Sequence, residues 1–355
     1  MNKEQYLEIF QNPVSEDLET ISTEDLFHNW KKITGLLPEE TVFTVIIPAY
    51  NEEPVITDSI AHLFDQELPE GSKMVIHVIA NGCTDRTEEI VKDIIAHNAS
   101  DIIEVKFDSI PDAGKAIALN HARSIYKEGI MIQMDADTFP TNNAVSKLFA
   151  LLASQENCVS GGVMPKRIGN EGNKHILAFQ DYFDHQMRTM GGLVGRLLAH
   201  RIERVVDFPH NLGSEDTWLE YWTAHNYGAH AVKFLGRHEE SDVSANYPGV
   251  MNYVDYTEQL FRWVAEYEKL LQEFPELFSA AVMSWTRMEQ PEGFFANLKD
   301  IKEKPEGLPF IDKVFAHYLI KVLGKMAKKK KFRDKFGKGS NWESPITDRV
   351  GAQNT

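Results

Sequence analysis

Two carboxylates stand one residue apart in the middle of the chain, with the spacing of a cation site. Asp135 and Asp137 flank Ala136 and follow the apolar segment GIMIQM. If that segment is a strand, both carboxylates leave its carboxyl end together, while Ala136 turns the other way. Their oxygens could share a divalent cation whose remaining positions go to water and phosphate oxygens, as Mg²⁺ prefers. A solvated turn is the alternative, and for the triplet alone it is the commoner one.

A second acidic pair, Glu215 and Asp216, follows Ser214, which is a favourable N-cap residue. The segment EDTWLEYWTAHNYG predicts a helix that ends at Gly228. Because N–H dipoles at a helix start favour ionised carboxylates, we expect a base that stays charged at neutral pH. Such a base accepts the proton of a hydroxyl nucleophile as it attacks. A capping pair without a catalytic role is the alternative.

Three further side chains have the spacing of one helix face. Gln259, Arg262 and Trp263 project from one side of a predicted helix. The planar guanidinium of Arg262 suits a diphosphate, and the indole of Trp263 offers a stacking surface for a sugar ring or an acceptor. An amphipathic helix with an interfacial Trp is the alternative. His238 precedes this helix, and its imidazole is either a metal ligand or simply solvated.

The segments that must position these residues alternate between short apolar runs and amphipathic stretches. Expected strands are 42–48, 74–80, 101–107, 129–134 and 158–164, and expected helices are 54–66, 84–98, 114–127 and 142–154. Buried strands joined by crossover helices predict a parallel, doubly wound α/β sheet. Ligands of such sheets bind at the carboxyl ends of the strands, where residues 50–52, 81–82 and 135–137 stand.

Six segments in this order resemble the motifs of family 2 glycosyltransferases, which have the GT-A fold. They are IIPAYNEE, VIANGCTDRT, GKAIALNHA, MDAD, GSEDTWL and QLFRW, the last matching Gln-x-x-Arg-Trp. The resemblance spans Val42 to Trp263. It implies a GT-A fold, a Rossmann-like and mainly parallel sheet with flanking helices, and an inverting, metal-dependent transfer of a sugar from a nucleotide sugar to a hydroxyl acceptor.

The resemblance also assigns roles to residues. It makes Asp216 the base, with Glu215 positioning the acceptor or the pocket. It places Mn²⁺ or Mg²⁺ on Asp135 and Asp137, with His238 as an additional candidate ligand. The nucleotide-sugar pocket implied in this way consists of Pro48, Tyr50, Asn51, Glu52, Asn81, Lys115, Asp135, Ala136, Asp137, Gln259, Arg262 and Trp263. Lys115 alone, at the start of a helix, would be read as exposed to solvent.

Two departures from the family pattern bear on the substrates. Asn81 stands where the family commonly has an aspartate near the base, and Asn carries donors and no charge. Uridine is favoured because Gln-x-x-Arg-Trp is associated with UDP-sugar enzymes, while guanine stays open. Polysaccharide synthases with that motif often have transmembrane helices, but no run of about 18 apolar residues occurs here. We therefore expect limited, non-processive transfer to a glycan or lipid-linked acceptor.

The composition narrows the partners and the compartment. The 355 residues carry a net charge of -16, which argues against a nucleic-acid partner for the body of the protein. Two cysteines without metal-ligand spacing, and no signal peptide, fit a cytoplasmic protein. The segment 321–338 is strongly basic and follows an amphipathic helical pattern. It is either a peripheral contact to the inner face of a membrane or a solvated helix end.

The same pattern predicts the domain organisation. An acidic, helical extension covers 1–40, and the catalytic domain covers 41–265, with a nucleotide-sugar half at 41–163 and an acceptor half at 164–265. A helical region with the basic tail covers 266–355. Two other functions remain possible from sequence. A sugar-phosphate nucleotidyltransferase shares the sheet and the metal carboxylates, and a non-catalytic nucleotide-sugar-binding scaffold would need the pocket but no base.

Overall fold

The computed structural model describes residues 41–169, 172, 176–177, 180–181, 184, 192–236, 242–249 and 253–277. The predicted N-terminal extension, His238, most of the predicted C-terminal region and its basic tail lie outside these ranges. The domain division and the membrane contact therefore stay predictions. Among the helices within the ranges, none has the length and apolar composition that crossing a bilayer requires.

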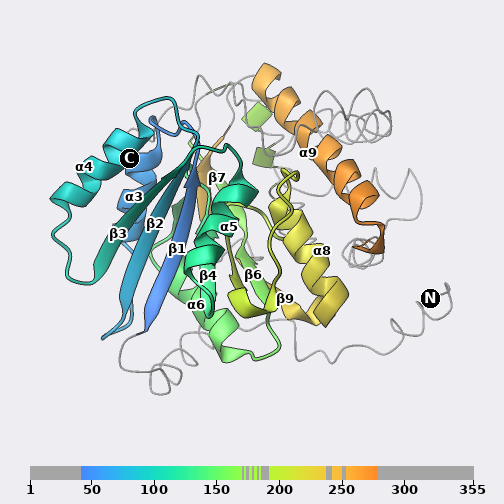
Figure 1. Cartoon of the computed structure of the whole chain (residues 1–355), viewed down its shortest axis with the longest axis horizontal. Helices are drawn as coiled ribbons and strands as arrows, with labels where there is room; N and C mark the ends of the chain where they lie inside the picture. Colours follow the sequence, from blue (N-terminus) through green and yellow to red (C-terminus); the bar gives the residue numbers. More distant parts are fainter. Residues whose placement is uncertain are drawn as a thin grey trace.

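A seven-stranded mixed sheet forms the centre of the described structure (Figure 1). Its strand order is β3-β2-β1-β4-β8-β6-β9. The first four strands of that order are parallel, and β8 runs antiparallel to both of its neighbours. The strands are β1 (Val42–Ala49), β2 (Lys73–Asn81), β3 (Ile103–Ile110), β4 (Ile130–Met134), β6 (Ser160–Val163), β8 (Leu197–Arg201) and β9 (Val232–Leu235).

Helices cover both faces of the sheet because the central strands are apolar on both sides. One core contains Ile60 of α3, Val91 of α4 and Leu148 of α6. The other contains Leu119 of α5 and Trp218 of α8, together with residues of α9. The helices are α3 (Ile56–Phe64), α4 (Thr87–His97), α5 (Lys115–Ile125), α6 (Ala144–Ser154), α8 (Glu215–Tyr227) and α9 (Tyr253–Glu273).

A small second sheet begins two residues after Asp137. It has the order β5-β10-β7, in which β10 is antiparallel to β5 and parallel to β7. Its strands are β5 (Phe139–Pro140), β7 (Pro165–Ile168) and β10 (Ala245–Pro248). The pairing brings β10, from late in the chain, beside the segment that carries the aspartates.

The strands and helices expected along residues 42–164 are confirmed, and so is the mainly parallel sheet with flanking helices. The first predicted helix begins at Ile56 rather than at Pro54. The sheet is mainly rather than wholly parallel, since the antiparallel strand β8 lies between β4 and β6. The proposed boundary at residue 265 falls inside α9.

Candidate active site

The turns after β1 and β2 are tied to each other at the carboxyl edge of the sheet. Asn51 has a left-handed backbone, with φ 55°. Its side-chain oxygen accepts the Thr84 N–H at 2.7 Å and the Asp85 N–H at 3.3 Å. The backbone N–H of Glu52 donates to the Thr87 hydroxyl at 2.8 Å. Asn51 therefore has a structural task here, and its predicted contact with a nucleotide, like those of Pro48, Tyr50 and Glu52, stays a prediction.

Asn81 ends β2 and is buried, with 2% of its surface exposed. Its side-chain oxygen has no hydrogen-bond partner in the described part of the chain. A buried acceptor without a partner is costly, and a ligand N–H would remove that cost. The predicted contact of Asn81 with a nucleotide base stays a prediction.

Lys115 lies at the centre of the site rather than in solvent. Its ammonium group donates to the Asp135 carboxylate at 2.6 Å and forms a second ion pair with Glu215. Burial by itself would lower the pKa of Lys115, but Asp135, Glu215 and Asp216 together raise it. The lysine therefore stays charged, and it links the carboxyl end of β4 to the start of α8.

Arg196, which the sequence analysis did not identify, holds the other aspartate of the triplet. Its guanidinium donates to Asp137 at 2.6 Å and lies over the ring of Tyr247, 4.1 Å from the centroid. Both side chains of the Arg196–Asp137 pair are nearly buried. The backbone carbonyl of Arg196 also accepts the Asp135 N–H at 3.0 Å. Arg196 belongs to none of the six motifs, and the only signal was its place just before the apolar run of β8.

Asp216 is held by backbone donors from two segments. The Gly195 N–H donates to one carboxylate oxygen at 2.8 Å, and the Thr217 N–H donates to the other at 2.7 Å. Ser214 precedes α8 as predicted, but its side chain makes no capping hydrogen bond. The orientation of Asp216 is therefore set by the loop before β8 as well as by its own helix.

Burial, and not only the helix start, influences the pKa values of the acidic pair, and the prediction that Asp216 stays charged at neutral pH stays a prediction. Burial raises the pKa of Glu215 to about 7, against the opposing effect of Lys115. Burial likewise raises the pKa of Asp216, although Lys115 and two backbone N–H groups lower it. Removing a carboxylate from water outweighs the dipole of one helical turn here.

Gly195 brings the backbone of the loop before β8 close to this cluster. A Cβ at Gly195 would lie 2.8 Å from the Lys115 ammonium, and 3.4 Å from both the Asp216 and Glu215 carboxylates. Only a residue without a side chain lets the backbone N–H reach Asp216 while Lys115 stays in place. Sequence reasoning missed this residue, since an isolated glycine in an irregular region carries no distinctive signal.

The charges of the cluster leave room for a divalent cation. The four carboxylates of Asp135, Asp137, Glu215 and Asp216 face two cations, Lys115 and Arg196, so the formal balance is -2 when all are ionised. Lys115 pairs with Asp135 and Arg196 pairs with Asp137, so both carboxylates are placed where they contact a positive charge. Within the described ranges, no three His, Cys, Asp or Glu side chains form a complete metal site.

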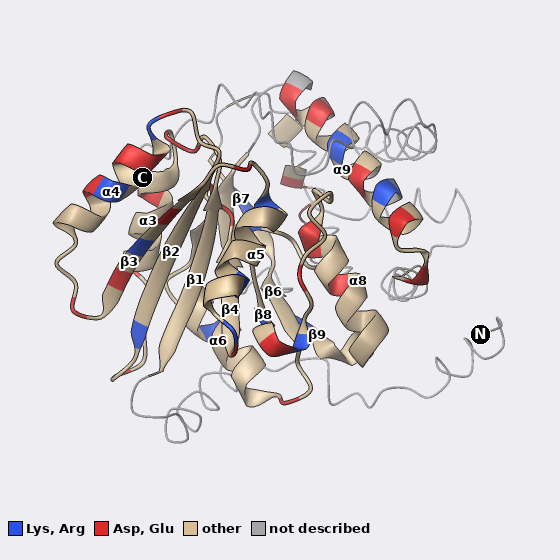
Figure 2. Cartoon of the chain, in the orientation of Figure 1, with Lys and Arg blue, Asp and Glu red and all other residues tan. Residues whose placement is uncertain are grey.

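Figure 2 shows these charges in the fold, with basic colour at the start of α5 and acidic colour on α8.

The helix α9 carries Gln259, Arg262 and Trp263 as predicted, and 38% of the Trp263 surface is exposed. The Gly213 N–H, in the loop before α8, donates to Glu266 of α9 at 2.9 Å. Thus α9 and the start of α8 are physically connected, while the predicted substrate contacts of α9 stay predictions.

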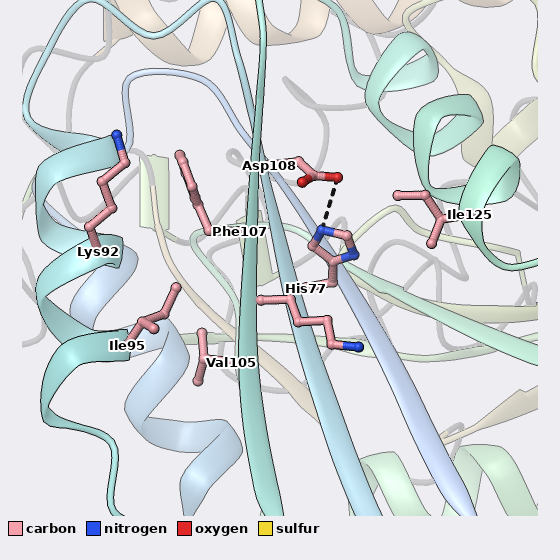
Figure 3. A pocket seen from close by; sticks show the side chains of 8 residues that line it. His77, Lys92, Ile95, Val105, Phe107, Asp108 and Ile125 are labelled. Carbon is pink, nitrogen blue, oxygen red and sulfur yellow. Dashed lines mark ion pairs between the residues drawn. The ribbon is translucent and has the colours of Figure 1, made fainter.

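A separate, shallow pocket lies at the outer edge strand β3 (Figure 3). His77 and His121 both approach the Asp108 carboxylate, at 3.3 and 2.8 Å. Lys92 lies over the ring of Phe107, 5.0 Å from its centroid. The pocket contains no residue of the predicted nucleotide-sugar site, so the carboxylate cluster is the stronger candidate for chemistry.

Comparison with known proteins identifies the domain around this cluster. Residues 44–202 match the family model described as glycosyl transferase family 2. These residues form a family 2 glycosyltransferase domain. The probable glycosyltransferase YdaM of Bacillus subtilis (strain 168) is 30% identical to this chain over 139 residues. That match covers 39% of the chain and 31% of the relative, so the chain spans about a third of the curated protein it matches.

A solved structure shows the same fold at low sequence identity. The mannosyltransferase PcManGT from Pyrobaculum calidifontis, solved in complex with GDP-Man and Mn²⁺, has a TM-score of 0.51 and 18% identity. The similarity covers 88% of this chain and 90% of that one. The predicted GT-A fold is therefore confirmed, and the predicted family is confirmed for residues 44–202. Glu215, Asp216 and α9 lie beyond residue 202, where the family model ends, so their roles rest on the geometry above.

Proposed function

We propose that the glycosyltransferase domain moves a sugar from a nucleotide sugar to an acceptor hydroxyl, with inversion at the anomeric carbon. One observation carries this proposal. Two acidic pairs distant in sequence, 135/137 and 215/216, meet around Lys115 at the carboxyl edge of the sheet. The first pair suits a cation and the second a base, which are the two functions that such a transfer needs.

The donor half of the site would hold the nucleoside diphosphate. Asp135 and Asp137 would hold Mn²⁺ or Mg²⁺, which stabilises the charge that develops on the departing diphosphate. Lys115 and Arg196 supply fixed positive charge in a largely buried setting, where such charge is most effective. Asn81 faces the base with an acceptor that lacks a partner in the described structure.

The base of the nucleotide is left between two candidates. Uridine is favoured by the resemblance of QLFRW to Gln-x-x-Arg-Trp, on α9. The solved mannosyltransferase with this fold was in complex with GDP-Man, which keeps guanine in the proposal. Both nucleotides therefore belong in every binding experiment on this chain.

The acceptor half contains the proposed base. Asp216 accepts the hydroxyl proton as that oxygen attacks the anomeric carbon, while Gly195 and Thr217 hold its two oxygens in place. Their N–H groups favour the ionised carboxylate and oppose the effect of burial. The ion pair between Glu215 and Lys115 holds these two side chains in place beside Asp216. We propose non-processive transfer to a glycan or lipid-linked hydroxyl.

Replacement of the base tests the proposal. The Asp216→Asn variant keeps the size of the side chain and removes its basicity. We expect turnover of a nucleotide sugar to fall roughly a hundredfold to ten-thousandfold, while nucleoside diphosphate affinity stays near that of the wild type. Released nucleoside diphosphate is the quantity to measure. Wild-type turnover in the variant would remove Asp216 from the role, and release of pyrophosphate from a nucleoside triphosphate and a sugar phosphate would indicate a nucleotidyltransferase instead.

A further inference from the structure

Arg196 connects three parts of the domain that are distant in sequence. Its guanidinium contacts Asp137, which follows β4, and the ring of Tyr247, which belongs to β10. Its neighbour Gly195 donates to Asp216 at the start of α8. Leu193, three residues earlier, donates its N–H to the buried carboxylate of Glu220, also on α8, at 2.9 Å. Backbone hydrogen bonds of Leu193 and Gly195 thus hold the segment 193–196 against α8, and the side chain of Arg196 extends from it to Asp137 and Tyr247.

The ion pair of Arg196 competes with a bound cation. Asp137 gives one oxygen to Arg196 at 2.6 Å, and only 7% of its side chain is exposed. A divalent ion at Asp137 would stand within a few ångströms of the guanidinium, and the low dielectric of a buried site makes that repulsion strong. Arg196 must therefore weaken or leave its contact with Asp137 when the ion binds.

The surroundings of Arg196 suit a second position for its guanidinium. A guanidinium has five N–H donors, and one of them serves Asp137. The planar fork of these donors matches a diphosphate, and the face of Tyr247 supports a cation at more than one orientation. A nucleoside diphosphate at the triplet would offer the guanidinium a new anionic partner when the divalent cation binds Asp137.

We propose that Arg196 exchanges partners, from Asp137 in the metal-free protein to the donor diphosphate when a divalent cation occupies the triplet. The exchange makes the cation and the nucleotide bind interdependently. The cation displaces the Arg196 guanidinium from Asp137, and the diphosphate supplies the anion that this guanidinium then contacts. The affinity for either ligand therefore rises when both are present. This inference rests on the proposed function, and it assigns a positioning and coupling role to a residue outside the family motifs.

Equilibrium binding of Mn²⁺ tests the exchange without any measurement of activity. Free Mn²⁺ is followed by electron paramagnetic resonance, with and without UDP or GDP, in the wild type and in Arg196→Gln. Loss of the competing cation should tighten nucleotide-free Mn²⁺ binding, and loss of the diphosphate contact should weaken nucleotide binding. We expect roughly a tenfold change in each, and a corresponding fall in the coupling between the ligands.

Two variants keep the result interpretable. Arg204→Gln removes the same charge beyond β8, at the opposite end of the sheet, and should bind both ligands as the wild type does. Arg196→Lys keeps a cation beside Asp137 and should leave nucleotide-free Mn²⁺ affinity close to that of the wild type. Mn²⁺ affinity that is unchanged or weaker in nucleotide-free Arg196→Gln would overturn the exchange. A wild-type chain that binds neither Mn²⁺ nor a nucleoside diphosphate would overturn the proposed function as well.

Discussion

Burial and neighbouring charges oppose each other at each ionisable group of this site. Glu215 and Lys115 form an ion pair in which the carboxyl group is almost inaccessible, and burial still raises the pKa of Glu215 to about 7. Arg196 and Lys115 keep their charges because carboxylates surround them. The ionised carboxylates of the site therefore outnumber its cations, and a bound cation and diphosphate would change how these charges pair.

The raised pKa of Glu215 predicts a pH dependence of stability in the metal-free protein. The folded chain holds a proton on Glu215 between its unfolded pKa of 4.5 and its folded pKa of about 7, where the unfolded chain has lost it. The stabilisation is complete below the unfolded pKa and is lost as pH rises through the folded pKa. From about pH 5.5 to about pH 8 the unfolding free energy should fall by on the order of 2 kcal/mol through this group.

Urea unfolding at those two pH values measures this effect. Glu215→Gln cannot titrate, so its unfolding free energy should fall by less than that of the wild type over the same interval. The same fall in both proteins would show that Glu215 is not the group responsible.

The lack of a side chain at Gly195 predicts a second residue-level effect. In Gly195→Ala the new methyl group overlaps the Lys115 ammonium position, so Lys115 must move away from Asp135 and Glu215. A displacement of this kind costs about 1–3 kcal/mol, and we expect nucleoside diphosphate affinity in the presence of Mn²⁺ to fall at least tenfold. Calorimetric titration measures it. Val194→Ala, in the same loop, is the control, and an unchanged affinity in Gly195→Ala would contradict the account.

Helix α9 is joined by hydrogen bonds to the loop that precedes α8. Glu266 of α9 accepts the Gly213 N–H, and a Cβ at Gly213 would lie 3.2 Å from the Glu266 carboxyl carbon. Asn211 donates to Glu273, near the end of α9, at 2.6 Å. The loop that leads into the acidic pair of α8 is thus packed against α9 along its length.

Removal of the Glu266 carboxylate should loosen the start of α8. Glu266→Ala leaves the Gly213 N–H without this acceptor, and we expect a loss of about 1–3 kcal/mol in unfolding free energy, with a lower kcat. Glu266→Gln keeps an acceptor oxygen and should lose less of both. Glu258→Ala, on the exposed face of the same helix, is the matched control. Denaturant unfolding and turnover measure the two effects, and wild-type values for Glu266→Ala would refute the connection.

The regular elements were predictable where periodicity was long and clear. The strands 42–48 and 74–80 are apolar runs flanked by turn residues, and the structure extends each by a residue or two. Strands β5, β7 and β10 have two to four residues each, too few for an apolar pattern to be recognised. β8 was missed because its antiparallel place in the sheet depends on pairing with β4, which local sequence does not encode.

The site was predictable only to the level of its motifs. Asp135, Asp137, Glu215 and Asp216 were named from spacing and resemblance, and the structure gathers them around Lys115. Arg196 could not be foreseen, since its proximity to Asp137 arises from the tertiary arrangement of β4 and β8. The same is true of the pKa directions, because burial is a property of the folded chain.

At the scale of the whole molecule, the fold brings residues from distant parts of the chain to one edge of one sheet (Figure 1). The family model covers 44–202, and this part supplies Lys115, Arg196 and the triplet that we propose to bind a cation. The segment after residue 202 supplies the proposed base and the helix α9. The proposed transfer therefore needs both segments in one functional unit, with the donor bound between them.

A thermal-denaturation panel of UDP- and GDP-sugars, with and without Mn²⁺, tests the central claim most directly. A ligand that binds only the folded chain stabilises it by mass action, so a bound donor raises the Tm. We predict that at least one nucleotide sugar raises the Tm when Mn²⁺ is present and that its omission removes the effect. The variant with Asp135→Asn and Asp137→Asn should show no such increase. A panel in which no nucleotide sugar shifts the Tm, or an equal shift in the variant, would contradict a metal-dependent nucleotide-sugar site at this triplet.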